Sequence, residues 1–523
     1  MGVLLLSLAC SSHPPARPTT SHQKAGATAT VDPEPPLQAA ADARHLLERF
    51  GFGPRPGDVE RVLEIGTHAW FERQLLADEL PDPRGERAVQ PYSRALAPPE
   101  QLPGLFAKGG IPLEPADGGS AWEQSRELMR QTSLGQLLLE LQTAEIVRHV
   151  ESEHQLREVM VAFWTDHFNV YAKKEEVRLL AGDYVERVIR PLALGRFADL
   201  LVATARHPAM LRYLDNVSNR FRAKQVRDDL PGINENYARE LLELHTLGVN
   251  GGYTQADVVA AARILTGWSF RPGPGGLGYT FHFDPRFHDR GSKQLLGTTF
   301  AADRNEEEGL ELLGLLARHP ATAAHLAHKL CVRFVADSPP ADCIEVTAAA
   351  LLESDGDIKV ALRALVGSRS FWSKETRRRK LKTPLEFLVS AVRGLDARLA
   401  GTTELARAAA RLGEAPFVQP SPAGRIENSA YWLQSFTLAR LRFAHDLAFG
   451  RVPGVALDRH ATLAGWDDPT TLGTRLSALL LGGAASERTL AAIDQALAEA
   501  ADEDERFSSG VALTLSSPEF QWR

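Results

Sequence analysis

The sequence predicts a mainly α-helical protein, an irregular multi-helical body with one small β-hairpin inserted near residues 268–300. Apolar residues recur three or four positions apart through most of the chain, for example over 322–335 and 384–395, and this is the helical period. Alternation of apolar and polar residues is convincing only at 279–283, where Gly/Pro-rich runs flank it, and it predicts a strand. The sequence has no repeat of fixed period, which argues against a solenoid.

The composition is that of a globular protein, and it argues against nucleic-acid binding and against a membrane-spanning helix. Of 523 residues, 44% are hydrophobic and 24% are charged, which is enough apolar material for a large interior. The formal net charge is -7 with both signs interspersed, so the chain lacks the basic footprint that nucleic-acid binding requires. No apolar run approaches the ~20 residues of a membrane-spanning helix. We therefore expect no nucleic acid as partner and no membrane span.

The first residues resemble a bacterial lipoprotein signal. Met1–Ala9 reads MGVLLLSLA, an apolar run that ends in small residues directly before Cys10. In such signals the apolar segment is removed and the cysteine becomes the first mature residue, which carries the lipid. We therefore expect residues 1–9 to be a signal segment, a lipid on Cys10 to be the membrane anchor, and the location to be extracytoplasmic, in the periplasm or at the outer membrane. The alternative is a frayed apolar N-terminus without a targeting role.

Polar segments divide the rest of the chain. Residues 10–36 are rich in Ser, Thr, Pro and Ala and are expected to form a flexible tether. After residue 37 helical periodicity dominates. A Pro/Gly-rich stretch at 81–119 is expected to be a surface loop, and a looser Ala/Gly/Pro-rich stretch at 398–429 is a candidate internal boundary before the last helices.

Cys331 and Cys343 are the only cysteines besides Cys10. They lie twelve positions apart, across a predicted helix end and a Ser-Pro-Pro turn, so an oxidising compartment could join them in a disulfide. Two buried free thiols are the alternative. The pair forms no CxxC pattern, which disfavours a metal site built from it.

The segment Asn234–Gly248 predicts a complete helix, capped by Asn234 and closed by a left-handed Gly248. Glu240 and Glu243 share one flank of this helix, and His245 lies on its apolar flank, where we expect it to be buried. One interpretation is a structural network of Arg239, the two carboxylates and a core histidine. The other is a catalytic site in which Glu240, Glu243 and His245 are metal ligands or general bases and Arg239 orients a carboxylate.

Two further histidines are candidates for chemistry. His167 lies on the apolar face of a predicted helix over 155–170, whereas Asp166 lies off that face. A histidine in this position is either a core residue or a ligand. His288 follows the predicted strand in a Gly-rich loop, where we expect it to have more freedom, with Lys293 nearby. The candidate ligands for a divalent metal are therefore His167, His245, His288, Glu240 and Glu243.

Other polar groups have a spacing that presents them on one helix face. Glu145, His149 and Glu153 follow each other at intervals of four, which would suit a metal site. We favour an exposed stripe of ion pairs, and the same interpretation holds for His325 and His328.

Several stretches of the sequence together carry a family resemblance: His45–Pro54, Phe163–Phe168, Asn234–Gly248, Gly252–Asp257, Thr266–Trp268, His288–Lys293 and Ser517–Phe520. With them the chain resembles the bacterial family known as domain of unknown function 1800, over about residues 40–523. This resemblance implies that 37–523 is a single family-length helical unit and that the protein is exported, and many relatives are encoded beside another exported family. It implies no reaction. The chain departs from the family pattern at Glu158-Val159 and at Pro422–Glu427.

Two classes of function fit these observations. The first is a binding or assembly protein that works with another exported protein, which it would recognise through surface loops such as 81–119. The second is a metal-assisted extracytoplasmic enzyme, a hydrolase or oxidoreductase, because carboxylates and imidazoles are the only concentrated chemistry in the chain. The sequence contains no HExxH, GxSxG or phosphate-binding loop motif.

Overall fold

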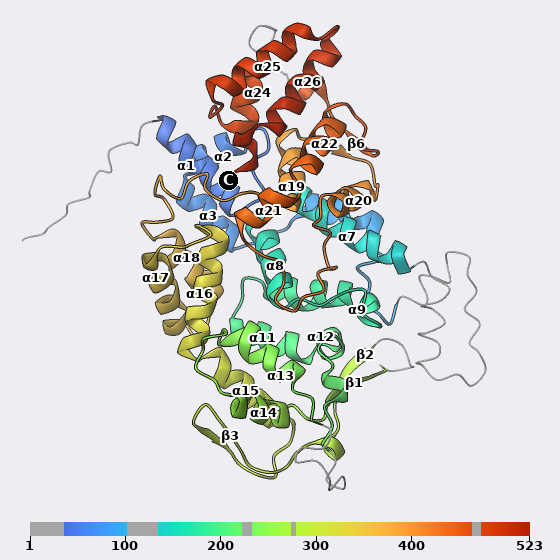
Figure 1. Ribbon diagram of the computed structural model, residues 1–523, viewed down its shortest axis with the longest axis vertical. Helices are drawn as coiled ribbons and strands as arrows, with labels where there is room; N and C mark the ends of the chain where they lie inside the picture. The colour runs from blue at the N-terminus through green and yellow to red at the C-terminus, as the bar shows by residue number, and fades with distance from the viewer. Residues whose placement is uncertain (1–35, 102–133, 222–232, 273–278, 463–471) are drawn as a thin grey trace, which may run out of the picture.

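The computed structural model describes residues 36–101, 134–221, 233–272, 279–462 and 472–523. The expected signal segment, the lipidation site Cys10 and nearly all of the expected tether therefore lie outside the described residues. Most of the body is helical, and it is elongated, with α24–α26 at one end and α14, α15 and β3 at the other (Figure 1). The predicted fold class is confirmed.

The first half of the chain forms an N-terminal helical group and a central one. The N-terminal elements are α1 (Pro36–Arg49), α2 (Asp58–Ile65), α3 (Thr67–Leu75), α4 (Pro83–Val89) and the 3-10 turn η1 (Gln90–Tyr92). The central elements are α7 (Leu134–Glu151), α8 (Gln155–His167), α9 (Val177–Tyr184), the π-helical η2 (Val185–Ile189), α10 (Arg190–Leu192), α11 (Phe197–Arg206), α12 (Pro208–Tyr213), η3 (Asn216–Ser218), α13 (Asn236–Glu240), the π-helical η4 (Leu241–Thr246) and α14 (Gln255–Ile264).

The predicted hairpin is present between these helices and the next group. β1 (Trp268–Pro272) pairs antiparallel with β2 (Tyr279–Phe283), and Trp268 lies opposite Phe283. After the turn η6 (Pro285–Phe287), a second hairpin joins β3 (Lys293–Leu295) to β4 (Thr298–Phe300). A third short pair, β5 (Arg398–Leu399) with β6 (Val455–Ala456), links segments far apart in sequence.

The second half of the chain is again helical. Its elements are α15 (Glu306–Ala317), α16 (Pro320–Phe334), α17 (Ala341–Glu353), α18 (Ile358–Val366), α19 (Pro384–Gly394), α20 (Glu404–Arg411), α21 (Ser429–Ser435), α22 (Thr437–Ala448), α23 (Arg459–Thr462), α24 (Leu472–Leu476), the π-helical η8 (Ser477–Leu481), α25 (Glu487–Glu499), α26 (Glu503–Ser516) and α27 (Pro518–Gln521). Among the described helices, none combines the length and apolarity needed to cross a membrane.

Helix α19 lies at the centre of the core, and all of its residues are buried. It begins with a capping box between Thr383 and Glu386 and with Pro384 in its first turn, which satisfies backbone N–H groups that would otherwise be unpaired in the interior. One continuous apolar cluster runs from Ala43 to Phe520 and includes α19. The N-terminal and C-terminal helices thus share a single core.

The pairs β3–β4 and β5–β6 were not predicted, and two further segments differ from their prediction. The stretch 398–429 contains an unpredicted helix, α20, because Leu405, Ala408 and Leu412 are spaced three or four apart and pack into the common core. The segment Asn234–Gly248 is not one regular helix but a single α-helical turn followed by π-helix. The predicted closing residue is confirmed, because Gly248 is left-handed, whereas the N-cap position is Glu235 and Asn234 Oδ1 only accepts from the backbone N–H of Asn236 at 2.9 Å.

Candidate functional site

A cavity of about 370 Å³ lies between α8, α16, the start of α19 and the segment 414–432. This volume falls within the usual range of small-molecule sites. Its apolar lining comes from Phe52, Ala162, Phe163, Val332, Leu385, Ala423, Ile426 and Trp432. Its polar lining comes from Asp166, His167, His328, Lys329, Arg333, Asp337, Thr383, Glu386, Glu414, Arg425 and Glu427.

Helix α16 brings Lys329 and Arg333 to this cavity. The helix begins at Pro320, and the His319 ring accepts from the backbone N–H of Ala321 at 3.1 Å. Its buried stripe runs through Ala323, Leu326, Ala327 and Leu330 and faces the core. Lys329 and Arg333 are four residues apart, so their side chains lie on one edge of the helix and reach the same space.

Lys329 forms a hydrogen-bonded chain with His167 and the backbone of η4. Lys329 Nζ donates to His167 Nδ1 at 2.9 Å, and His167 Nε2 donates to the carbonyl oxygen of His245 at 3.1 Å. That carbonyl is available because it belongs to the last turn of a helix, where backbone acceptors have no partner within the helix. The Nε2 atom of a second histidine, His325, lies 3.2 Å from the backbone carbonyl oxygen of Leu244. The contacts fix the tautomer of His167 and occupy both of its ring nitrogens.

His167 is neutral in this setting. Burial lowers the pKa of His167 well below its usual value, and the neighbouring charge of Lys329 lowers it further. Its Nδ1 therefore keeps a lone pair that points at the lysine Nζ.

The carboxylates around the cavity already have cationic partners. Asp166 accepts from Arg425 at 2.8 Å, and Glu386 pairs with Arg333 at 2.6 Å. Glu427 and Asp337 lie 3.1 Å and 2.8 Å from Lys380 Nζ. Arg523, at the end of the chain, also reaches Glu386. Lys329 is the lysine of the cavity lining that takes no part in these ion pairs.

Lys329 has no such partner. Within the described part of the chain, no carboxylate lies within 4.0 Å of its Nζ. Burial lowers the pKa of Lys329 to about 8, although the more distant charges of Asp166 and Glu427 act in the opposite direction. An ammonium group that lines a cavity without a counter-ion favours an anionic group in that cavity.

Glu414 is the second lining group that titrates near neutral pH. Burial raises the pKa of Glu414 to about 7, and Arg425, 3.9 Å away, only partly offsets this. One of its oxygens accepts from the backbone N–H of Leu385 at 2.7 Å. Cavities that combine a lysine of lowered pKa with a carboxyl of raised pKa are candidates for functional sites.

The predicted residues of the Asn234–Gly248 segment divide between the core and its outer flank. His245 is buried as expected, its ring centroid lies 6.1 Å from that of His167, and burial lowers its pKa to about 3. Glu243 accepts from the Tyr253 hydroxyl at 3.3 Å. Burial and the nearby charge of Glu243 raise the pKa of Glu240. Arg239 donates to Glu235 and Gln255, not to Glu240 or Glu243.

The expectation of a freely moving His288 is wrong. His288 is buried, with Nδ1 2.9 Å from the carbonyl oxygen of Thr266 and Nε2 3.2 Å from Glu308. The buried Lys293 donates to the same carboxylate at 2.7 Å. These contacts hold the loop against the core. His288 therefore belongs to a polar cluster of its own, separate from the contacts of His167 and His245.

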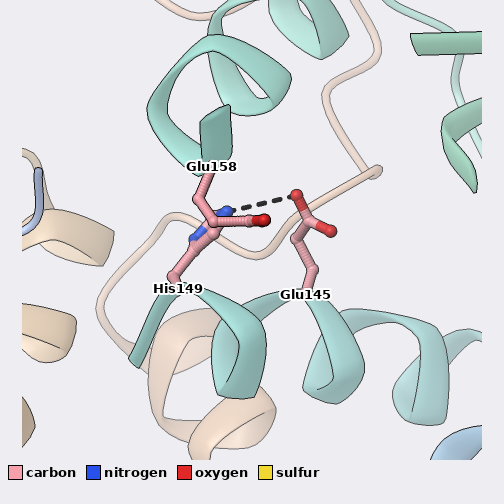
Figure 2. A group of neighbouring side chains, drawn as sticks. All are labelled: Glu145, His149 and Glu158. Carbon is pink, nitrogen blue, oxygen red and sulfur yellow. Dashed lines mark hydrogen bonds and ion pairs between the residues drawn. The ribbon is translucent and has the colours of Figure 1, made fainter. Parts of the chain in front are cut away.

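The expectation of an exposed stripe at Glu145, His149 and Glu153 is also wrong. Glu145 and His149 are buried, Glu153 is exposed, and Glu158 from α8 takes the third place in the group (Figure 2). These three are the one group of potential metal ligands that lie close enough together among the described residues. None of the five predicted metal ligands belongs to it.

The two carboxylates of the Glu145 group already pair with an arginine. Arg190 lies 2.6 Å from Glu158 and 3.3 Å from Glu145, and His149 Nε2 lies 3.1 Å from Glu145. Arg148 neutralises the adjoining Glu186 at 2.5 Å. A divalent cation would have to displace Arg190 from both carboxylates, so the arrangement favours a structural ion-pair network.

Cys331 and Cys343 are joined by a disulfide, with their Cα atoms 6.3 Å apart. The bond ties the helix that carries Lys329 to α17.

Sequence reasoning missed most residues of the cavity. Lys329 and Arg333 are polar positions in a predicted amphipathic helix, and such positions are usually assigned to solvent. Thr383 and Glu386 have capping-box spacing, which was a readable signal. Arg425 lies in the segment Pro422–Glu427, where the chain departs from the family pattern, and this departure was the available signal for that side of the cavity.

The fold is that of a helical protein, with a partly open cavity lined by both apolar and charged side chains. Residues 45–522 match the family described as "Protein of unknown function (DUF1800)", so the chain belongs to this family. None of the curated proteins and none of the solved structures matches the chain.

Proposed function

We propose that this protein is an exported binding protein that holds a small organic anion in the Lys329 cavity. The observation that carries the proposal is the ammonium of Lys329, which lines the cavity and donates to the neutral His167 but has no carboxylate within 4.0 Å among the described residues. A bound carboxylate would supply the missing counter-ion and form a charge-assisted hydrogen bond.

The apolar residues of the lining indicate what the remainder of the ligand is, beyond its carboxylate. Phe163, Val332 and Trp432 give the cavity an apolar part beside its charged one. Apolar contacts supply most of the affinity in such sites, and a few polar groups fix the orientation. The ligand class is therefore an organic acid with an apolar portion.

Export, the lipid anchor on Cys10 and an exported protein partner, all expected from the sequence, belong to the same proposal. The disulfide between Cys331 and Cys343 supports the location, because disulfides persist in oxidising compartments outside the cytoplasm. A metal-assisted enzyme, the alternative, has less support, because the carboxylates near His167 and in the Glu145 group are occupied by arginine and lysine.

Calorimetric binding of 3-phenyllactate, which joins a carboxylate to an aromatic body, tests the proposal. Lys329→Gln is expected to weaken binding at least about tenfold, which is the size of one lost charge-assisted hydrogen bond. The exposed Lys374→Gln, which removes the same charge elsewhere, should bind as the wild type does. Equal binding by Lys329→Gln, or equal binding of the neutral amide of phenyllactate, would contradict the proposal.

A further inference from the structure

The arrangement around Lys329 is also that of an activated amine. A nucleophilic side chain is usually activated by a base within hydrogen-bond distance, and a third group orients that base. Here Lys329 Nζ is the amine, His167 Nδ1 is the base at 2.9 Å, and the backbone carbonyl of His245 orients the ring from its other nitrogen at 3.1 Å. Since the carbonyl holds the proton on Nε2, the lone pair of Nδ1 stays directed at the amine.

Two further features indicate that Lys329 can act as a nucleophilic amine and not only as a positive charge. No carboxylate among the described residues lies within 4.0 Å to hold Lys329 as an ammonium ion, and burial lowers its pKa to about 8, so the neutral amine is accessible. The amine also lines a cavity that can admit a small molecule, so a carbonyl carbon can approach it.

We propose that Lys329 forms a reversible imine with an aldehyde or 2-oxo group of the ligand held in this cavity. The inference rests on the proposed function, because the ligand must first occupy the Lys329 site. The lysine Nζ lone pair attacks the carbonyl carbon and a C–N bond forms. The two amine protons leave with the carbonyl oxygen as water, and a C=N bond replaces C=O. No oxidant or reductant is consumed.

The same chain contains a matched comparison. Lys382 is more deeply buried than the half-buried Lys329, and burial lowers the pKa of Lys382 to about 7. It does not line the cavity, and its Nζ lies 3.7 Å from the centroid of the Phe520 ring. If burial alone made a lysine reactive, Lys382 would react at least as readily as Lys329. If access to the cavity and the contact with the His167 base determine which lysine is reactive, only Lys329 reacts.

Reductive trapping tests the inference. The mature protein is incubated with phenylpyruvate and sodium cyanoborohydride, and the modified lysine is located by peptide mass spectrometry. We expect a secondary-amine adduct on Lys329 and none on Lys382. Lys329→Arg, which keeps the charge but cannot form an imine, should abolish the adduct. His167→Gln should slow trapping at least about a hundredfold, which is the lower end of the usual contribution of a general base.

The outcomes separate the inference from the proposed function. Binding of phenyllactate and phenylpyruvate with equal affinity, without an adduct on Lys329, would overturn the imine and leave the anion site standing. Adducts spread over exposed lysines, equally in wild type and Lys329→Arg, would also overturn it. Binding of neither acid would overturn both. The adduct map of the wild-type protein needs no variant, so it decides the question even where a variant folds poorly.

Discussion

Lys329 Nζ lies 2.9 Å from His167 Nδ1, and this contact joins two helices, α16 and α8, that are far apart in the sequence. The acceptor is a neutral ring whose other nitrogen donates to the backbone of η4. The contact therefore couples three elements at the wall of the cavity. It also leaves the half-buried ammonium of Lys329 with no carboxylate within 4.0 Å among the described residues, and this has a measurable consequence for stability.

Lys329 is expected to make folding less favourable at neutral pH than at high pH. Its folded pKa of about 8 lies below the ordinary lysine value, so the cost of burying the charge is full below pH 8 and disappears as the pH rises toward the unfolded pKa of about 10.4. The difference in unfolding free energy between wild type and Lys329→Met should shift by roughly 1–3 kcal/mol in favour of the wild type between pH 7 and pH 10. Urea unfolding at both pH values measures it. A difference that stays constant with pH would contradict the assigned pKa.

Glu386 should be among the residues most costly to remove. It caps α19, pairs with Arg333 at 2.6 Å and lies 3.1 Å from Arg523, all in the buried core. Glu386→Ala leaves two buried guanidinium groups without this partner and is expected to cost about 3–5 kcal/mol. Chemical denaturation measures the loss, and the exposed Glu353→Ala is the control. A loss below about 1 kcal/mol would show that the arginines find other partners.

Glu386 also predicts sensitivity to acid. Burial alone would raise its pKa, but Arg333 and Arg523 together lower it to about 2. A carboxyl whose folded pKa is depressed stabilises the protein above its unfolded pKa of about 4.3 and loses this contribution as the pH falls through the folded value. The wild type should therefore lose stability between about pH 5 and pH 2, and Glu386→Gln should lose less over the same interval.

Local patterns in the sequence predicted the elements and their ends well. The hairpin at 268–283 and the burial of His245 follow from spacing within a few residues. The surroundings of Lys329 could not be predicted in this way, because they come from α8, η4 and the segment 414–427. Helical periodicity says which face of a helix is buried but not which distant helix covers it. For the same reason, Glu145 and His149 were expected on the surface and are in the core.

The disulfide between Cys331 and Cys343 should contribute about 3 kcal/mol to stability, because it closes a short loop in the unfolded chain. The double variant Cys331→Ala, Cys343→Ala and reduction of the wild type should lower the unfolding free energy by similar amounts. Thiol labelling of the denatured protein, with and without prior reduction, checks that the bond is present. Two thiols that react without reductant would contradict both the disulfide and its support for export.

Cys10→Ser tests the anchor. The variant should move the protein from the membrane fraction to the soluble extracytoplasmic fraction, because it removes the cysteine whose lipid is the proposed membrane anchor. Metabolic labelling with a fatty acid should mark the wild type and not the variant. An unchanged membrane fraction without lipid label would rule out this anchor.

His245→Ala and His288→Ala distinguish the binding protein from the metal-assisted enzyme. In the structure each histidine has a packing role: His245 is buried beside Phe168 and His167, and His288 is buried beside Glu308 and Thr266. We therefore expect both variants to lose roughly 1–3 kcal/mol of stability through lost packing and unpaired polar groups, with the metal content of protein purified without chelators unchanged from the wild type. Elemental analysis and thermal unfolding measure the two quantities on the same samples. Stoichiometric metal that disappears in both folded variants would mean that distant polar clusters share an ion, and the enzyme would replace the binding protein as the better explanation.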